Sequence, residues 1–360
     1  MDFNVSDRTI YLVRHGSHAY GTSTPTSDED FKGICVPPRD YYLGFMKSFE
    51  QAEKYASKGH DRDEVVYSVE KFFKLAADCN PNIIEVLCVD DSDVVKIDEF
   101  GELLRAHRNA FLSTKARHTF SGYAHAQLRR IETHRRWLFE SSRYERPRPT
   151  REEHGLKPQK DGYKAQIEMA LAQVEKKLDE WNIDMMGMEE SEKINLKNRL
   201  SEHFGALEYT RNGLWLSAAV ASFENTNLIY ELQQERAYAN VVSDWEIYHD
   251  WKKNRNPARA ELEAKFGYDT KHAGHFIRLM RMCREILEGK GVIVRRPDAE
   301  EILDIRRGRR DYDSIIEEAR RIDAECNELY KTSKLPRIPD RAMLDGLCVK
   351  IVEEFHRKKG

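Results

Sequence analysis

The chain has 360 residues, enough for one large domain or two smaller ones, and 34% of them are charged. Its formal net charge is only −3, so the protein as a whole does not attract nucleic acid, and a polyanion-binding surface must be a local basic patch. The sequence has neither a long apolar run nor a secretory signal pattern, so we expect no membrane contact and a cytoplasmic protein.

The six cysteines are scattered and form no C-x-x-C pair. This spacing argues against a cysteine-based zinc site and favours buried free thiols in a reducing compartment. The cysteines are Cys35, Cys79, Cys88, Cys283, Cys326 and Cys348.

Short apolar segments alternate with a helical pattern in the first hundred residues. Residues 9–15 (TIYLVRH) and 28–36 (DEDFKGICV) have the length and composition of β-strands. Residues 63–77 carry apolar side chains at helical spacing. Residues 83–89 (IIEVLCV) follow an Asn-Pro-Asn break and read as another short strand, which contains one acid.

From about residue 98 onward the pattern is helical throughout. We therefore expect an α+β protein: a small mixed-sheet core at residues 1–115 and a mostly helical region at 116–360. Prolines, glycines and charges predict an exposed linker or loop at 143–162. The expected helices cover 101–141, 163–181, 190–203, 212–240, 258–265, 271–289, 298–330 and 340–358.

Two aspartates separated by a single residue lie at the start of the second predicted strand. Residues two apart on a strand point to the same face, so Asp28 and Asp30 present their carboxylates side by side. Like charges this close raise each other's pKa unless a cation lies between them. A divalent ion with oxygen ligands is such a cation, and magnesium binds in this way together with substrate phosphates.

Gly16 and Ser17 end the first predicted strand, where backbone N–H groups and a hydroxyl are well placed to bind a triphosphate. Glycine lets a phosphate approach the backbone closely, and Gly21 is suited to end the short turn that follows. The lone acid of the third predicted strand, Glu85, is costly to bury without a partner. It is therefore the candidate for a third metal-binding carboxylate, although a salt bridge to an arginine explains it equally well.

The ordered combination of these features resembles a known active-site signature. The stretch GSHAYGTSTPTSDEDFKGI resembles that of the DNA polymerase β-like nucleotidyltransferase superfamily, and most closely the RlaP-like predicted nucleotidyltransferases associated with RNA repair. SVEKFFKLAADCNPNIIEVL and YDTKHAGHFIRLMRMCREIL extend the resemblance over roughly residues 9–290. It implies that Gly16 and Ser17 contact the phosphates of an NTP, and that Asp28, Asp30 and Glu85 bind Mg²⁺ or Mn²⁺.

A basic helix near residues 268–287 is the second element with functional candidates. Its Lys271, His275 and Arg278 share one face, and the resemblance implies that Lys271 and His272 line the nucleotide site. Without the resemblance, an amphipathic helix with solvated basic residues explains the same pattern. His272 and His275 lack a suitably spaced partner for a zinc site. Arginine-rich stretches at 129–136, 295–296 and 306–310 are candidate phosphate-backbone contacts or ion-paired surface helices.

These observations predict a metal-dependent nucleotidyltransferase. It would move an NMP from an NTP to a hydroxyl acceptor and release pyrophosphate, with an RNA end, tRNA included, as the expected acceptor and the helical region as its clamp. Nucleotidylation of a protein side chain, as in AMPylation, is the first alternative. A non-catalytic nucleotide or RNA sensor is the second, and it would be favoured if Glu85 faced away from Asp28 and Asp30. The nucleotide and the oligomeric state are not predictable from the sequence.

Overall fold

The computed structural model describes residues 3–25, 27–54, 62–156 and 226–359. The chain divides into two compact units, one formed by residues 1–139 and 256–360 and the other by residues 140–255. The expected boundary at residue 115 separates a catalytic core from a helical region. Compact units do not reveal such roles, so this boundary stays a prediction.

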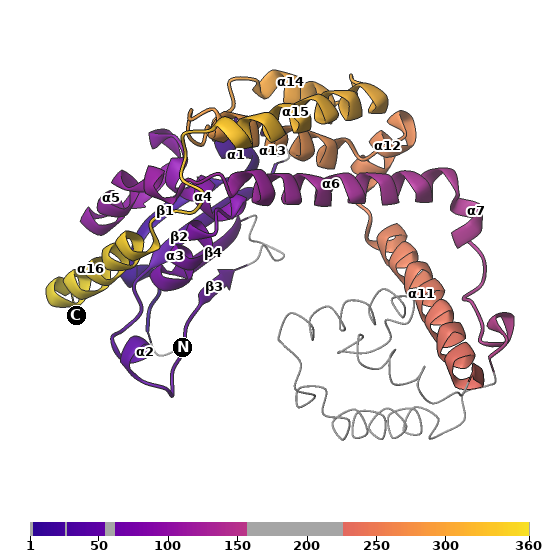
Figure 1. Ribbon diagram of the computed structural model, residues 1–360, viewed down its shortest axis with the longest axis horizontal. Helices are drawn as coiled ribbons and strands as arrows, with labels where there is room; N and C mark the ends of the chain where they lie inside the picture. The colour runs from indigo at the N-terminus through magenta and orange to yellow at the C-terminus, as the bar shows by residue number, and fades with distance from the viewer. Residues whose placement is uncertain (1–2, 26, 55–61, 157–225, 360) are drawn as a thin grey trace, which may run out of the picture. The chain divides into compact units, whose positions relative to one another are not determined.

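A mixed sheet forms the N-terminal part of the first unit (Figure 1). Its strands are β1 (Thr9–His15), β2 (Glu29–Cys35), β3 (Gln51–Lys54), β4 (Arg62–Ser68) and β5 (Val94–Ile97), in the order β3-β4-β2-β1-β5. β2 and β4 pair in parallel, and the other neighbours pair antiparallel. β1 and β2 agree with the predicted strands, and the α+β fold class is confirmed.

Helices pack against the sheet and extend the same unit. The long helix α13 is buried along most of its length and packs against α6, α14 and α15, with Phe276, Ile277 and Met280 among its core side chains. The helices are α1 (Gly16–Tyr20), α2 (Asp40–Leu43), α3 (Val69–Ala77), α4 (Pro81–Ile84), α5 (Glu99–Ala106), α6 (Ala116–Phe139), α12 (Pro257–Phe266), α13 (Thr270–Leu287), α14 (Ala299–Arg306), α15 (Tyr312–Thr332) and α16 (Arg341–Lys359). The 3₁₀ turns are η1 (Ser6–Arg8), η2 (Glu85–Cys88), η3 (Asp91–Asp93) and η4 (Arg108–Phe111).

The described part of the second unit is helical. It contains α7 (Ser141–Tyr144), η5 (Glu152–His154) and α11 (Thr226–Asn254). The rings of Tyr144 and Tyr248 stack with centroids 5.1 Å apart and join α7 to α11. Among the described residues, no helix is both long and apolar enough to cross a membrane.

Several predicted elements differ from the structure, and one is the helix expected at 101–141, because α5 ends at Ala106 and α6 begins only at Ala116. The segment 63–77 is wrong as one helix, because its first part is strand β4 and α3 begins at Val69. The segment 83–89 is wrong as a strand: the Asn80 side chain caps α4 by accepting a hydrogen bond from Asn82 N, and the chain continues into η2. The helix expected at 298–330 is broken between α14 and α15, where Gly308 has a φ of 72°.

The helices expected at 163–181 and 190–203 lie outside the described residues, as does the first part of the one expected at 212–240. The other late helices, α12, α13 and α16, agree with their predicted spans to within two residues.

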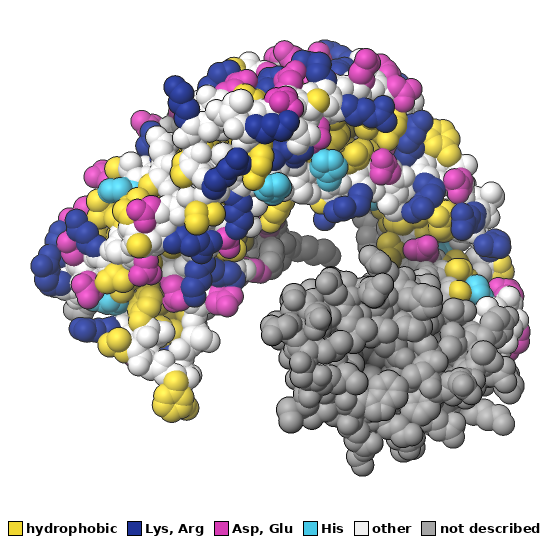
Figure 2. All heavy atoms as spheres, in the orientation of Figure 1, with side chains coloured by type: hydrophobic (Ala, Val, Ile, Leu, Met, Phe, Trp, Pro, Cys, Tyr) yellow, Lys and Arg dark blue, Asp and Glu magenta, His cyan; other side chains and the backbone are white. Residues whose placement is uncertain are grey.

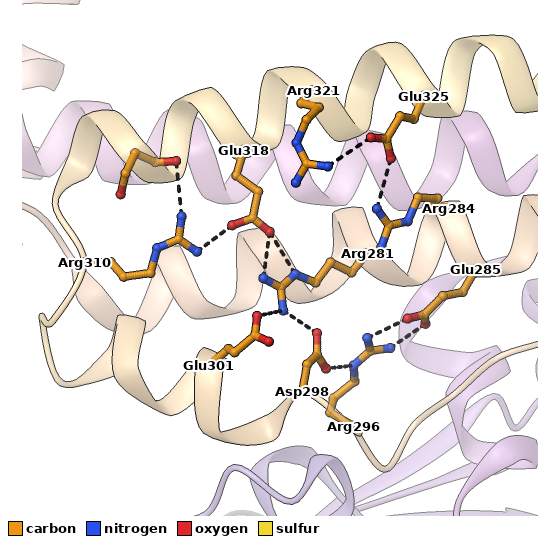
Figure 3. A network of polar contacts seen from close by, with 11 residues as sticks. Arg281, Arg284, Glu285, Arg296, Asp298, Glu301, Arg310, Glu318, Arg321 and Glu325 are labelled. Atoms are coloured by element: carbon orange, nitrogen blue, oxygen red, sulfur yellow. Dashed lines mark hydrogen bonds and ion pairs between the residues drawn. The ribbon is translucent and has the colours of Figure 1, made fainter.

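A network of arginines and carboxylates joins α13, α14 and α15 (Figure 3). The guanidinium of Arg296 is buried and binds both oxygens of Glu285 at 2.5 and 2.7 Å, and it also contacts Asp298 at 2.8 Å. Asp298 in turn contacts Arg281, which binds Glu318 on α15. Each buried charge therefore has a partner of opposite sign, as burial requires.

We predict that Arg296→Gln lowers the free energy of unfolding by about 3 kcal/mol or more, because it leaves Glu285 without its buried counter-charge. Arg321→Gln is the matched control, because Arg321 contacts Glu325 at 3.1 Å on the exposed side of α15. This substitution should lower the free energy of unfolding by less than about 1 kcal/mol. Equilibrium urea unfolding of both variants measures the difference. Equal destabilisation by the two substitutions would contradict the prediction.

Candidate functional site

The junction of β1 and α1 is built around a glycine. His15, the last residue of β1, pairs with Asp30 on β2, and Gly16 follows with a φ of 66°. A Cβ atom at Gly16 would overlap the Oδ2 atom of Asp30. Glycine is therefore needed here both for the backbone angle and for the close approach of this carboxylate. Gly21 ends α1 in the left-handed conformation, as predicted.

Three aspartates lie near one another where strands β2 and β4 begin. Asp30 pairs with Asp63 across the parallel β2–β4 ladder, and Asp28 immediately precedes β2 on the same side as Asp30. Burial raises the pKa of the Asp30 carboxyl, and the charges of Asp63 and Asp28 raise it further. Asp63 was not a predicted site residue, because its segment was interpreted as a helix rather than as the strand next to β2.

A group of cations faces these acids from the C-terminal helices. Burial lowers the pKa of Lys271 on α13, and the nearby Arg259 and Arg306 lower it further, while Asp28 and Asp30 oppose this effect. Lys271 thus lies within electrostatic reach of both predicted aspartates. The Arg306 guanidinium donates a hydrogen bond to the carbonyl of Thr22, just after α1. Lys271 of α13 therefore lies near the aspartates, and Arg306 of α14 lies beside the end of α1.

Glu85 has a different environment from the three aspartates. Its side chain is fully buried, and the Tyr20 hydroxyl donates to its Oε2 atom at 2.6 Å. The Arg278 guanidinium donates to Oε1, also at 2.6 Å, and His15 Nε2 lies 3.4 Å from Oε2. Burial by itself raises the pKa of the Glu85 carboxyl, but Arg278, assisted by His15 and Tyr20, holds that pKa well below its usual range.

These contacts occupy both carboxylate oxygens of Glu85. The same ion pair joins two segments 193 residues apart, and the Arg278 guanidinium also lies 3.8 Å from the centroid of the Tyr20 ring. Tyr20 belongs to α1, the helix that begins at Gly16, so the Glu85 cluster fixes α1 against α13. The structure brings Gly16, Asp28, Asp30 and Lys271 near one another, whereas Glu85 is buried in an ion pair with Arg278.

His272 contacts a carboxylate that lies on its own helix. Asp269 caps α13 by accepting a hydrogen bond from His272 N on Oδ1, and its Oδ2 lies 2.6 Å from His272 Nδ1. His134 Nδ1 on α6 lies 3.1 Å from the same oxygen. Burial alone would raise the pKa of Asp269, but the two imidazoles hold it well below its usual range. A role for His272 in nucleotide binding stays a prediction.

Two of the three arginine-rich stretches are largely neutralised by acids. Arg295 binds Asp93 at 2.6 Å, and Arg296 belongs to the buried network described above. In the stretch 306–310, Arg309 and Arg310 bind Asp304 and Glu318. Figure 2 shows basic and acidic side chains interspersed over α14 and α15. These stretches therefore form ion-paired surfaces rather than an uncompensated basic patch.

Comparison with known proteins bears on this same part of the chain. Residues 2–143 match the sequence model of the RlaP family, described as an RNA repair pathway DNA polymerase beta family. The match covers less than half of the chain and shows the likeness of this segment to the family. The resemblance expected from the Gly-Ser and D-x-D stretch is thereby confirmed for residues 2–143, which hold the sheet and α6. The RlaP match ends at residue 143, so the likeness noted for residues 268–287 stays a prediction.

A similar protein is found in Enterobacteria phage T4. It is an uncharacterized 38.9 kDa protein from the nrdC-mobD intergenic region, 36% identical over 127 residues. The alignment covers 33% of this chain and 38% of the phage protein, so the chain matches little more than a third of that relative's length. No solved structure matches the chain.

We predict that Glu85→Gln lowers the free energy of unfolding by about 3–5 kcal/mol at neutral pH, because it leaves the Arg278 guanidinium buried without a counter-charge. The folded-state pKa of Glu85 lies below its ordinary value of 4.5, so its contribution is present above pH 4.5 and is lost as the pH falls below it. The difference in the free energy of unfolding between wild type and Glu85→Gln should therefore become smaller at acidic pH.

Urea unfolding at neutral and acidic pH tests this prediction. Glu102→Gln on the exposed face of α5 is the control and should have little effect at any pH. A Glu85→Gln protein as stable as wild type at neutral pH would show that the buried pair contributes no stability.

Proposed function

We propose that the RlaP-like part of the chain transfers a nucleotide from an NTP to a hydroxyl acceptor, with release of pyrophosphate. The observation that carries this proposal is the placement of Asp28 and Asp63 near Asp30, whose carboxylate packs against Gly16, inside the segment that matches the polymerase beta family. The family's RNA-repair description supports an RNA end as the acceptor, and tRNA ends are among the candidates.

The aspartates fit a divalent cation. Burial and the neighbouring carboxylates raise the pKa of Asp30 although Lys32 and Lys271 oppose this, so a further cation beside Asp30 would stabilise its charged form. Carboxylate oxygens are the ligands that Mg²⁺ and Mn²⁺ prefer. When bound, such an ion would neutralise phosphate charge and lower the pKa of the acceptor hydroxyl. We assign its binding to Asp28 and Asp30, with Asp63 as the third carboxylate in place of Glu85.

The remaining residues hold the nucleotide in position. Gly16 leaves room beside the Asp30 carboxylate, and the backbone N–H groups and hydroxyl at Gly16 and Ser17 are suited to phosphate oxygens. Lys271 faces the aspartates and would balance the charge of the triphosphate. Glu85 acts as a positioning residue, because its ion pair with Arg278 sets α13 relative to α1. Positioning and charge neutralisation would then supply most of the rate.

Two other functions use the same fold. A protein side chain as acceptor, as in AMPylation, would need no basic groove, and the ion-paired arginines at 295–296 and 306–310 are compatible with it. A non-catalytic sensor is the second alternative, and it gains support because Glu85 binds Arg278 and Tyr20 instead of lying with the aspartates. Asp63 offsets that argument, since it offers a carboxylate opposite Asp30.

The proposal predicts transfer of label from an α-³²P-labelled NTP to RNA in the presence of Mg²⁺ or Mn²⁺. Asp30→Asn and Asp63→Asn should each lower the rate by about 100-fold or more, because each removes a charge that binds the metal. Glu29→Gln is the matched control: Glu29 lies between the two site aspartates but is exposed on the opposite face of β2. It should retain the wild-type rate.

The labelled product separates the alternatives. Label on RNA that requires metal and Asp30 supports the proposal, whereas label on a polypeptide supports the protein acceptor. Asp30→Asn removes an unfavourable buried charge, so its free energy of unfolding should equal or exceed that of wild type, and a lost activity cannot then be ascribed to unfolding. Wild-type protein that binds NTP but labels neither acceptor would support the sensor.

A further inference from the structure

Two histidines and an aspartate converge where α6 passes the start of α13. Their candidate ligand atoms all lie within 4.8 Å of one another, and among the described residues they form the one such group of histidine, cysteine or acidic side chains. Asp269 Oδ2 lies 3.1 Å from His134 Nδ1 and 2.6 Å from His272 Nδ1. None of these three side chains carries a step in the proposed transfer.

The local fold presents these atoms to one another. Asp269 is only 2% exposed, and its Oδ1 atom already caps α13, which leaves Oδ2 for the two imidazoles. The ring of Trp137 stacks on His134 with centroids 5.5 Å apart and an interplanar angle of 22°. The His134 and His272 rings stand at 89° to each other, so they approach the carboxylate from different directions. The donors are therefore held in place by capping and stacking contacts.

We propose that His134, Asp269 and His272 form a binding site for a divalent transition metal, with Zn²⁺ as the first candidate. Two imidazole nitrogens and one carboxylate oxygen are a donor set that Zn²⁺ accepts, whereas Mg²⁺ prefers oxygen ligands alone. The imidazole nitrogens now lie at hydrogen-bond distance from Asp269 Oδ2, and they would move away from it as an ion about 2.0–2.2 Å from each ligand atom enters between them.

The exposure of the three side chains suits an ion that keeps one open position. The side chains of His134 and His272 are 16% and 17% exposed, and that of Asp269 is 3% exposed. Solvent can thus reach the imidazoles, and a water molecule can complete a four-coordinate site. The site would be distinct in ligand type from the aspartate cluster, and it would fasten α6 to the N-terminus of α13, the helix that carries Lys271. The inference does not depend on the proposed nucleotide transfer.

The test measures Zn²⁺ binding by the full-length chain without any activity assay. Protein stripped with a chelator is titrated with ZnCl₂ against a chromophoric competitor, and retained zinc is counted by mass spectrometry after dialysis. We expect about one Zn²⁺ per chain, and binding weakened by at least about 100-fold in His134→Gln and His272→Gln. Asp269→Asn should weaken it as well while preserving the helix cap, since asparagine caps helices as well as aspartate does.

His125→Gln is the matched control, because His125 lies on the same helix α6 with its Nδ1 near the carbonyl of Ser121 and contributes nothing to the cluster. It should bind zinc as wild type does. Co²⁺ substitution of the unmodified protein is the check that needs no variant, and it should give visible bands without a thiolate charge-transfer band. Absence of zinc binding by wild type, binding unchanged in Asp269→Asn and His272→Gln, or a thiolate band would each overturn the proposal.

Discussion

The buried pair of Glu85 and Arg278 is the constraint on which the candidate site depends. A carboxylate with no exposure at all is tolerated because a guanidinium from α13 and the Tyr20 hydroxyl satisfy both of its oxygens. Since Tyr20 belongs to the helix that starts at Gly16, this one cluster fixes the Gly-Ser turn against α13. Lys271, two helical turns before Arg278 on the same face, is thereby directed toward the aspartates.

The aspartate cluster is a different case, in which carboxylates of like charge lie near one another. Burial, Asp63 and Asp28 all raise the pKa of Asp30. Its carboxylate can approach the backbone at residue 16 because Gly16 has no side chain. Such an arrangement costs folding free energy, and sites of this kind are typical of functional centres. Glu85 is thus paired with Arg278 inside the protein and builds the frame, while the carboxylates near Asp30 offer oxygen ligands that a divalent cation would accept.

The N-terminal half of the site was predictable because its signals are local. Strand β1, the Gly-Ser turn and the D-x-D start of β2 each depend on neighbouring residues. Asp63 was missed because its role follows from parallel pairing with β2, a long-range contact that the helix-like spacing of 63–77 conceals. Glu85 was assigned to a strand because its apolar segment resembles one, although the cap at Asn80 starts a helix there. Its arginine partner lies too far along the chain for local patterns to reveal it.

Our central claim is that the aspartates bind the metal and that Glu85 instead pairs with Arg278. The most direct test is a crystal structure with Mn²⁺ and a non-hydrolysable NTP analogue. The anomalous signal of manganese locates the ion independently of any assumption about its ligands. We predict a peak bonded to the carboxylates of Asp28 and Asp30 beside Asp63, with the triphosphate against Lys271 and the Glu85–Arg278 pair intact. An ion held by Glu85 with Arg278 displaced, or an analogue bound away from the three aspartates, would contradict this account of the site.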